Sequence, residues 1–326
     1  MSNSTSGFEF QDYEAVRRDL PLLLALVGES GGGKTFSSLE LATGIVKQNG
    51  GEIFFIDTEA NRALHYAEDF KFRHVPFSAP FGPLRYMAAV QYCISRGAGC
   101  VIIDSMTHEH TGEGGVLDQI ETFLQEKCGN DFNKRKKMTW ASQIKPKAER
   151  QKLTNYLLQA SKDCPIILCY RGKDKLDFKH MDENGPKNLG VQAQTTSPLI
   201  WETVQQFLLR AGCDGVPVLL GETPQERALI KSPHMFRGWF QNGQRLNAEI
   251  GERFARWQNK AGTTPQAPPS YRDDADAVIY TIEQADTLDA VRAAYGAFYK
   301  MRDQYSATDC AAIAAAKDAA KARLES

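Results

Sequence analysis

The sequence predicts an α/β fold with a mostly parallel sheet, followed by a small helical domain. Two observations support this prediction. Four nearly continuous hydrophobic stretches have the length of single strands, and longer amphipathic stretches lie between them. Strands covered by helices on both faces carry such hydrophobic runs. Strands that alternate with helices along the chain are typical of a parallel sheet.

The predicted strands are residues 22–28 (LLLALVG), 52–58 (EIFFIDT), 100–105 (CVIIDS) and 164–171 (CPIILCYR). Hydrophobic residues recur at helical spacing over residues 35–48, 83–96 and 116–127, which are therefore predicted helices. The second of these opens with a proline, a residue favoured in the first helical turn. From about residue 201 to residue 239, short hydrophobic runs indicate antiparallel strands that complete the sheet.

Composition shifts divide the chain into three parts. Residues 1–258 are the predicted α/β core, and residues 259–270, rich in Pro, Gly, Thr and Ala, form a predicted linker. Residues 271–326 are rich in alanine and are predicted to form two or three helices. No internal repeat is apparent.

Bulk properties restrict the class of protein. The formal net charge of −1 means that any surface for a polyanion must be local. No stretch approaches the ~20 apolar residues of a membrane span, and the polar first residues have no signal-peptide pattern, so a cytoplasmic protein is expected. The chain has 7 cysteines without a CxxC pair. Cys100, Cys164 and Cys169 fall in predicted strands, which favours reduced, buried thiols.

The most informative motif lies between the first strand and the first helix. Residues 28–35 (GESGGGKT) fit the pattern GxxxxGK[ST] in the strand-to-helix context that this pattern requires. Glycines let backbone N–H groups turn towards a phosphate, and the helix N-terminus adds positive potential. A flexible linker, the alternative, would not require Lys-Thr here. The expected ATP-binding residues are Gly28, Glu29, Ser30, Gly31, Gly32, Gly33, Lys34 and Thr35.

Two further strand ends complete the expected site. Asp104 ends a hydrophobic strand and is expected to hold Mg²⁺ through water, together with the Thr35 hydroxyl. Ser105, not a glutamate, follows it, so another carboxylate must activate water. Because ligands bind beyond the carboxyl ends of parallel strands, Glu59 is the predicted general base, with a solvated strand-end carboxylate as the alternative. Asp57 assists the metal or caps the next helix, and Glu109 is the reserve base.

With GESGGGKT, IDTE and VIIDS in this order, the chain resembles the RecA/RadA-type recombinase ATPases. Residues 104–118 (DSMTHEHTGEGGVLD), where the predicted metal-binding strand runs into a segment rich in Ser, Thr and His, are similar to short phage-encoded members linked to single-strand annealing and recombination. The resemblance covers residues 20–171 well and residues 201–240 loosely. It implies a RecA-like P-loop core, ATP and Mg²⁺ as ligands, and Glu59 as the glutamate that activates water. The N-terminal helical DNA-binding domain of the archaeal and eukaryotic recombinases has no counterpart here. This departure from the family pattern argues against full strand exchange and leaves annealing or an accessory role in a filament as the expected alternatives.

A basic segment is the expected contact with DNA. Residues 133–147 carry six cations and no acid, and Trp140 can stack on an unpaired base. The alternative is a solvated basic face with Trp140 in the core. Residues 173–198 are predicted to be either disordered or a binding loop ordered by ligand. The candidate DNA-binding residues are Lys134, Arg135, Lys136, Lys137, Trp140, Lys145 and Lys147.

Three residues allow several interpretations. Arg171 can sense the γ-phosphate, act across a subunit boundary as a cationic finger, or form a structural ion pair. His108 and His110 have the spacing of metal ligands but no evident further ligand. Contact with nucleotide, DNA or a neighbouring subunit is the favoured interpretation of both.

Together these features predict a DNA-stimulated ATPase that requires ATP and Mg²⁺ and acts on single-stranded DNA in phage recombination or annealing. A homo-oligomer, ring or filament, and a single-strand DNA-binding or replication protein are expected partners. The alternatives are a P-loop ATPase that serves as a helicase loader or replication accessory, and a nucleotide-binding scaffold with little turnover.

Overall fold

The computed structural model describes residues 20–182 and 185–259, and beyond them residues 275, 278–279, 281–283, 285, 287–302, 305 and 307–325. Contacts separate a unit within residues 17–261 from a second unit that contains residues 262–326. Each unit is described by itself. The expected boundaries at residues 258 and 270 stay a prediction, because residues 260–274 lie outside the described part of the chain.

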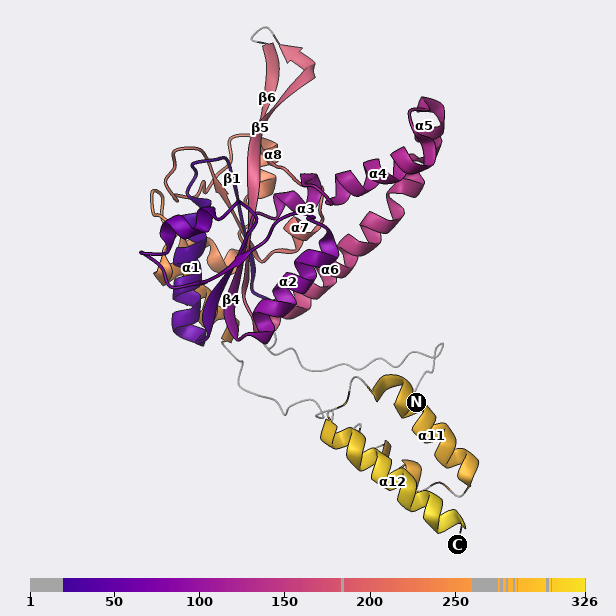
Figure 1. Cartoon of the computed structure of the whole chain (residues 1–326). Helices are drawn as coiled ribbons and strands as arrows, with labels where there is room; N and C mark the ends of the chain where they lie inside the picture. Colours follow the sequence, from indigo (N-terminus) through magenta and orange to yellow (C-terminus); the bar gives the residue numbers. More distant parts are fainter. Residues whose placement is uncertain are drawn as a thin grey trace, which may run out of the picture. The chain divides into compact units, whose positions relative to one another are not determined.

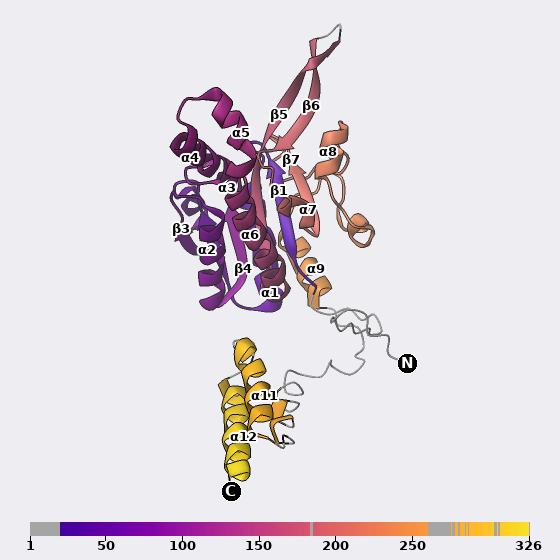
Figure 2. The ribbon, with the colours of Figure 1, turned by 90° about the vertical axis from the view of Figure 1, so that its right-hand side faces the viewer.

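The first unit is built on one sheet with the strand order β3–β2–β4–β5–β1–β7 (Figures 1 and 2). All neighbouring pairs in this order are parallel. This confirms the predicted α/β class with a mostly parallel sheet. The strands are β1 (Leu23–Gly28), β2 (Glu52–Asp57), β3 (Arg73–Pro76), β4 (Ala98–Asp104), β5 (Ile166–Asp182) and β7 (Gln205–Leu209).

Helices cover both faces of this sheet, which explains its continuous hydrophobic strands. Leu24 and Leu26 of β1 face one core cluster, to which α1 (Lys34–Asn49) and α9 (Ala248–Asn259) contribute. Their neighbours Ala25 and Val27 face the other, to which α2 (Pro83–Ser95) and α6 (Ile144–Asp163) contribute. The result is a helix–sheet–helix arrangement with the carboxyl ends of the strands at one edge.

Two glycines let α1 and α9 touch backbone to backbone. A Cβ on Gly44 would lie 1.8 Å from the carbonyl oxygen of Ala248, and a Cβ on Gly251 would lie 2.1 Å from that of Leu41. Real Cβ atoms do not approach backbone so closely, so both positions exclude other residues. This contact fixes α1, the helix that begins at Lys34.

Strand β5 continues beyond the sheet and pairs with β6 (Gly185–Ala193) as an antiparallel hairpin that projects from the body of the unit (Figure 1). The paired residues of the hairpin are therefore not disordered, and a binding role for residues 173–198 stays a prediction. Leu176 and Phe178 are exposed there. The part of the hairpin that projects is exposed, and burial is confined to residues such as Gly190 and Val191 near its base. Its sequence therefore lacks the sustained hydrophobic alternation that normally predicts a strand.

A second projection is helical. Between β4 and β5 the chain forms α3 (Thr107–Thr111), α4 (Val116–Cys128), α5 (Phe132–Ser142) and α6. The segment of residues 116–147, here called the helical arm, extends from the sheet region to its tip at α5 (Figure 1). Asp131 caps α5 by accepting a hydrogen bond of 3.0 Å from the Lys134 N–H.

The prediction that antiparallel strands complete the sheet over residues 201–239 is confirmed for one strand, β7 at the edge of the sheet, and is wrong in the direction of that strand and in the further strands it expected. The described structure places there α7 (Leu199–Glu202), β7, α8 (Pro224–Leu229) and the 3₁₀-helix η2 (His234–Trp239). β7 is parallel to β1, and one isolated antiparallel bridge joins Leu208 to Val218. Thr223 and Pro224 provide a helix start, with the Thr223 hydroxyl accepting from the Glu226 N–H. Because the helix begins at Pro224, residues 227–229 are helical and do not form one of the predicted strands.

The second unit contains α11 (Leu288–Met301) and α12 (Ala307–Glu325), as the prediction of a small helical domain requires. Ile282, Val291, Phe298 and Ile313 are buried between its helices. The Thr287 hydroxyl caps α11 by accepting from the Ala290 N–H.

All seven cysteines are free, and Cys100, Cys164 and Cys169 are buried, as predicted. Of the helices that the structure describes, none has the length and hydrophobicity needed to cross a membrane.

Candidate functional site

Residues 28–35 form a tight loop between β1 and α1. Gly31 and Gly33 have φ of 79° and 81°, the left-handed region that favours glycine. Gly28 and Gly32 must be glycine for a different reason, which is lack of space. An added Cβ would lie 2.0 Å from the Leu209 carbonyl oxygen at Gly28 and 2.7 Å from it at Gly32. The loop is therefore pressed against β7, and α1 starts directly after Gly33.

The N-terminus of α1 is open towards a cavity. Gly33 is the N-cap residue and provides no side-chain cap, so the first N–H groups of this 16-residue helix have no side-chain acceptor from it. Such a helix start favours an anion. Lys34, the first helical residue, donates from Nζ to the carbonyl oxygens of Gly28 and Glu29 at 2.9 and 2.7 Å. Burial lowers the pKa of its ammonium group.

Thr35 and Asp104 meet from distant parts of the sequence. The Thr35 hydroxyl donates a hydrogen bond of 2.6 Å to Asp104 Oδ2 at the end of β4. Burial raises the pKa of Asp104, and the Thr35 hydrogen bond opposes this shift. A hydroxyl and a carboxylate are hard oxygen ligands of the kind that Mg²⁺ takes. The pair therefore fits the expected magnesium site.

Glu59 lies beside Asp104 because their strands are neighbours. β2 pairs with β4 in a register that sets Asp57 opposite Asp104, and Glu59 follows two residues later. Asp57 orients this segment: its carboxylate accepts from the N–H groups of Glu59 and Ala63 at 2.7 and 3.0 Å and contacts His74 at 3.1 Å. Of the two expected roles for Asp57, the structure thus shows capping of the segment after β2.

The Glu59 carboxylate is held by Arg171, which lies on β5. The guanidinium Nε donates to Oε1 at 2.8 Å, and a second nitrogen donates to Oε2. Arg62 is at 3.8 Å from the same carboxylate. Glu59 is only 11% exposed and Arg171 is 46% exposed. Arg171 thus forms an ion pair within its own chain, one of the three interpretations that the sequence allowed.

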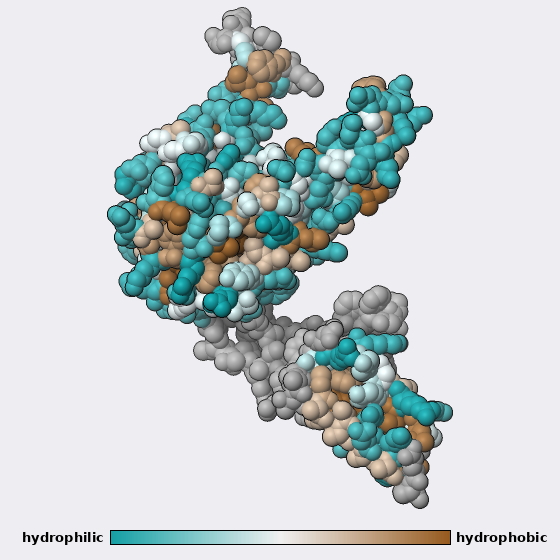
Figure 3. All heavy atoms as spheres, viewed as in Figure 1, coloured by the Kyte–Doolittle hydropathy of each residue, from teal (hydrophilic) through white to brown (hydrophobic). Residues whose placement is uncertain are grey.

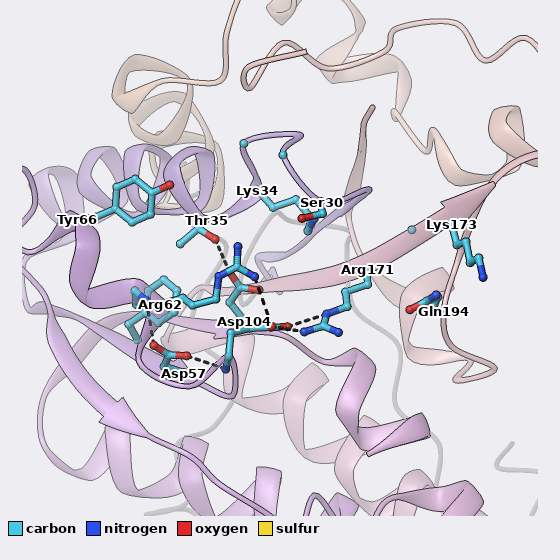
Figure 4. A pocket seen from close by; sticks show the side chains of 16 residues that line it. Ser30, Lys34, Thr35, Asp57, Arg62, Tyr66, Asp104, Arg171, Lys173 and Gln194 are labelled. Atoms are coloured by element: carbon cyan, nitrogen blue, oxygen red, sulfur yellow. Dashed lines mark hydrogen bonds and ion pairs between the residues drawn. The ribbon is translucent and has the colours of Figure 1, made fainter. Parts of the chain in front are cut away.

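These residues surround one cavity of about 490 Å³ (Figure 4). Lys173 and Gln194 line it from the base of the β5–β6 hairpin, and Tyr66 lines it from the 3₁₀-helix η1 (Arg62–Tyr66). The predicted residues that line it are Ser30, Gly31, Gly33, Lys34, Thr35, Asp57, Glu59, Asp104 and Arg171. Gly28, Glu29 and Gly32 instead fix the loop, since Gly28 and Gly32 abut β7 and the Glu29 carboxylate accepts from the Ala211 N–H at 3.2 Å.

Among the polar side chains that line this cavity, sequence reasoning missed Arg62, Tyr66 and Gln194. The first two follow the IDTE strand end, where the rule that placed Glu59 in the site also applies. Lys173 follows Arg171 by two residues at the same strand tip, so the phosphate-sensing role open to Arg171 is open to Lys173 as well. No signal in the sequence placed Gln194, because the return of β6 to the site depends on the hairpin.

The carboxylate and histidines after Asp104 do not form a second site. Glu109 is buried, forms a two-bond ion pair with Arg150 with both N–O distances 2.9 Å, and does not line the cavity. Because it lies outside the cavity, it does not fit the reserve role as a base there. His110 contacts Arg150 at 3.3 Å. His108 contacts the Thr58 hydroxyl at 2.8 Å and stacks on Phe81. The described residues contain no group of three or more ligands that suits a metal ion.

The basic segment lies on the helical arm and faces solvent. Trp140 is 75% exposed, so its predicted alternative place in the core is wrong. Arg135 differs from the other cations, because it is half-buried and pairs with the Glu121 carboxylate. The exposed cations are Lys134, Lys136, Lys137, Lys145 and Lys147.

Comparisons with known proteins add little to this description. No protein-family model matches the chain, and no curated protein sequence matches it. Among solved structures, the chain is similar to a KaiC-like protein from the hyperthermophilic archaeon Pyrococcus horikoshii, with 15% sequence identity and a TM-score of 0.26. That match covers 55% of this chain and 87% of the other. The fold and site themselves define an α/β protein with a P-loop.

Proposed function

We propose that this protein is a RecA-like P-loop ATPase that uses ATP and Mg²⁺ and acts on single-stranded DNA. One observation carries the proposal: Lys34, Thr35, Asp104 and Glu59 converge on one cavity from three distant segments of the chain. A phosphate-binding lysine, two oxygen ligands for a cation and a carboxylate base are the groups that phosphoryl transfer to water requires.

The loop and α1 would bind the phosphates. Backbone N–H groups of residues 31–35 face the anion, and the Lys34 ammonium moves from the carbonyls of Gly28 and Glu29 to phosphate oxygens. Thr35 and Asp104 would hold Mg²⁺, Asp104 through water. When bound, this ion neutralises charge on the β- and γ-phosphates.

Glu59 supplies the base. Its carboxylate accepts a proton from the attacking water, whose oxygen bonds to the γ-phosphorus while the bond to the β–γ bridging oxygen breaks, releasing ADP and phosphate. The ion pair with Arg171 opposes this role, because it occupies both carboxylate oxygens. Release of Glu59 from Arg171 is therefore part of the proposal, and the freed guanidinium can then face the γ-phosphate.

Single-stranded DNA would bind along the helical arm. Exposed lysines neutralise backbone phosphates, and Trp140 stacks on a base for about 1–3 kcal/mol. Arg135 is engaged by Glu121, and Lys145 lies 3.8 Å from the Glu149 carboxylate. The other four cations give a predicted log–log salt slope of about −2.8. The β5–β6 hairpin carries Arg171 and Lys173 at its base and exposes Phe178 further out. DNA bound to the hairpin would affect Glu59 indirectly, because Arg171 at the base of the hairpin is paired with the Glu59 carboxylate.

DNA binding is tested by fluorescence anisotropy with a labelled oligo-dT in the full chain. Lys136→Glu and Trp140→Ala should each weaken binding at least fivefold. Lys71→Glu, which reverses an exposed lysine outside the arm, should not. Equal affinities for Lys136→Glu and Lys71→Glu would remove the arm from the proposal.

The ion pair between Glu59 and Arg171 favours a second candidate function, a nucleotide-binding scaffold with little turnover. In that case ATP binds through Lys34 while Glu59 stays paired with Arg171. ATP turnover by Glu59→Gln separates the candidates: the ATPase loses its activity, whereas the scaffold behaves like wild type.

A further inference from the structure

The C-terminal unit has a groove of its own between α11 and α12, with a volume of about 600 Å³. Its floor includes Val291, Tyr295 and Tyr299, and we call it the α11–α12 groove. Four cations border it: Arg292, Lys300, Lys317 and Lys321. Figure 3 shows hydrophobic residues of this unit bordered by hydrophilic ones. The groove thus combines an apolar floor with a positive rim.

The two tyrosines form the main apolar surface of the floor. Their ring centroids are 6.2 Å apart, and Tyr299 is 53% exposed. Lys317 Nζ lies 4.9 Å from the Tyr295 ring, and Arg302 lies 4.4 Å from the Tyr299 ring. These cation–π contacts fix positive charge next to aromatic surface. An aromatic or aliphatic side chain placed there would meet rings below and cations beside it.

Gly296 keeps the groove open. It lies inside α11 between the two tyrosines, and a Cβ added to it would meet no atom within 4 Å. A glycine inside a helix lowers stability by about 0.5–1 kcal/mol relative to alanine. Neither φ nor close packing explains this glycine, whereas Gly44 in α1 is explained by contact with α9. The open space at Gly296 therefore suits a ligand.

Positive charge is concentrated at the groove although the unit as a whole is negatively charged. Residues 262–326 contain seven Lys and Arg and ten Asp and Glu, a formal net charge of −3. Four of the seven cations line the groove, with Asp318 as the one acid among its lining residues. Lys317 pairs with Asp318, and Arg292 with Asp289. Exposed pairs of this kind contribute about 0–1 kcal/mol, so a bound carboxylate can replace them.

We propose that the α11–α12 groove binds an acidic peptide segment of a protein partner. One aromatic or aliphatic side chain of the peptide enters the space above Gly296, and its flanking carboxylates contact the cationic rim. A nucleic acid fits less well, because the four cations surround one cavity with an aromatic floor instead of following a track along which a strand could lie. The proposal concerns the second unit and does not depend on the nucleotide site.

The test uses the full chain and a fluorescein-labelled peptide, Asp-Glu-Asp-Phe-Glu-Asp-Glu, in an anisotropy titration. Gly296→Gln fills the groove without changing charge and should weaken binding at least tenfold. Because glutamine is a better helix former than glycine, the same variant should melt at an equal or higher temperature. Lost binding therefore cannot reflect lost folding. Lys317→Glu should also weaken binding at least tenfold.

Two control variants test whether the loss of peptide affinity arises at the α11–α12 groove. Gly296→Ala adds one methyl group and should bind within twofold of wild type, and Lys136→Glu on the helical arm should leave peptide affinity unchanged. Three results would overturn the proposal: wild-type affinity in Gly296→Gln, equal affinity for a peptide with Asn and Gln in place of its acids, or loss of oligo-dT binding in Gly296→Gln. The last result would assign the groove to nucleic acid.

Discussion

The P-loop glycines have different physical roles, and Gly33→Ala tests the distinction most sharply. Gly33 combines a φ of 81° with a crowded site, where an added Cβ would lie 2.7 Å from the Gly215 backbone nitrogen. Gly31 has a φ of 79° but no atom within 4 Å of an added Cβ. Alanine at Gly31 therefore meets only the backbone penalty, whereas alanine at Gly33 also collides with fixed backbone.

The expected magnitudes follow from these contacts. A left-handed conformation costs alanine about 1–2 kcal/mol, and forced movement of packed backbone adds about 1–3 kcal/mol. The smaller entropy of the unfolded alanine chain returns about 0.4–1 kcal/mol in both variants. Gly31→Ala should thus lower the free energy of unfolding by about 1 kcal/mol, and Gly33→Ala by about 2–4 kcal/mol.

Urea unfolding followed by tryptophan fluorescence measures this difference, and a titration with a fluorescent ATP analogue measures its effect on the site. Gly33→Ala should lose most of its affinity for the analogue, since the displaced loop no longer presents its N–H groups. The reasoning is refuted if Gly33→Ala unfolds at the same urea concentration as Gly31→Ala.

Three further variants test the packing and electrostatics around the site. Gly44→Ala should lower the urea midpoint, although alanine normally stabilises a helix interior, because its Cβ would lie 1.8 Å from the Ala248 carbonyl oxygen; a raised midpoint contradicts the close α1–α9 contact. Arg150→Met leaves the buried Glu109 carboxylate unpaired and should destabilise by about 3–5 kcal/mol in the same assay, which a loss below ~1 kcal/mol would disprove. Burial, aided by the neighbouring Arg150 guanidinium, lowers the pKa of His110 below its usual 6.5. The unfolded chain then binds more protons, so stability is full above pH 6.5 and falls as the pH drops through the window between 6.5 and the lowered pKa. Melting temperatures of His110→Gln between pH 7.5 and 5 should show a flatter profile than wild type, and an unchanged profile would exclude His110 as the cause.

Much of the site was predictable because simple rules governed its parts. The P-loop pattern identified Lys34 and Thr35, and the carboxyl ends of adjacent parallel strands placed Glu59 near Asp104. Both inferences rest on short-range sequence signals and on sheet topology. Neither needs knowledge of side-chain partners.

The two ion pairs near the site, Glu59–Arg171 and Glu109–Arg150, were not predictable from the sequence. Glu59 and Arg171 are 112 positions apart, and each alone also fits a role in binding phosphate or water. Glu109 resembled a candidate base by position, but its partner Arg150 lies 41 residues away on α6. That helix was missed because only a few of its 20 residues are buried, among them Leu153 and Leu157, and its hydrophobic periodicity is weak.

The two projections were obscured for a related physical reason. The hairpin and the helical arm expose most of their surface, so burial imposes no clear hydrophobic period on residues 173–193 or 132–147. Composition still identified the arm as a basic segment with a tryptophan. It did not reveal that Glu121 neutralises Arg135, since this pair depends on how α5 folds back on α4.

The measurement that tests the central claim most directly is steady-state ATP hydrolysis with and without oligo-dT, in wild type, Lys34→Ala and Glu59→Gln. We predict that DNA stimulates wild type, that both variants lose turnover by about 100-fold or more, and that Glu59→Gln still binds the fluorescent ATP analogue. Wild-type turnover in Glu59→Gln, or turnover that is indifferent to DNA, would contradict the account.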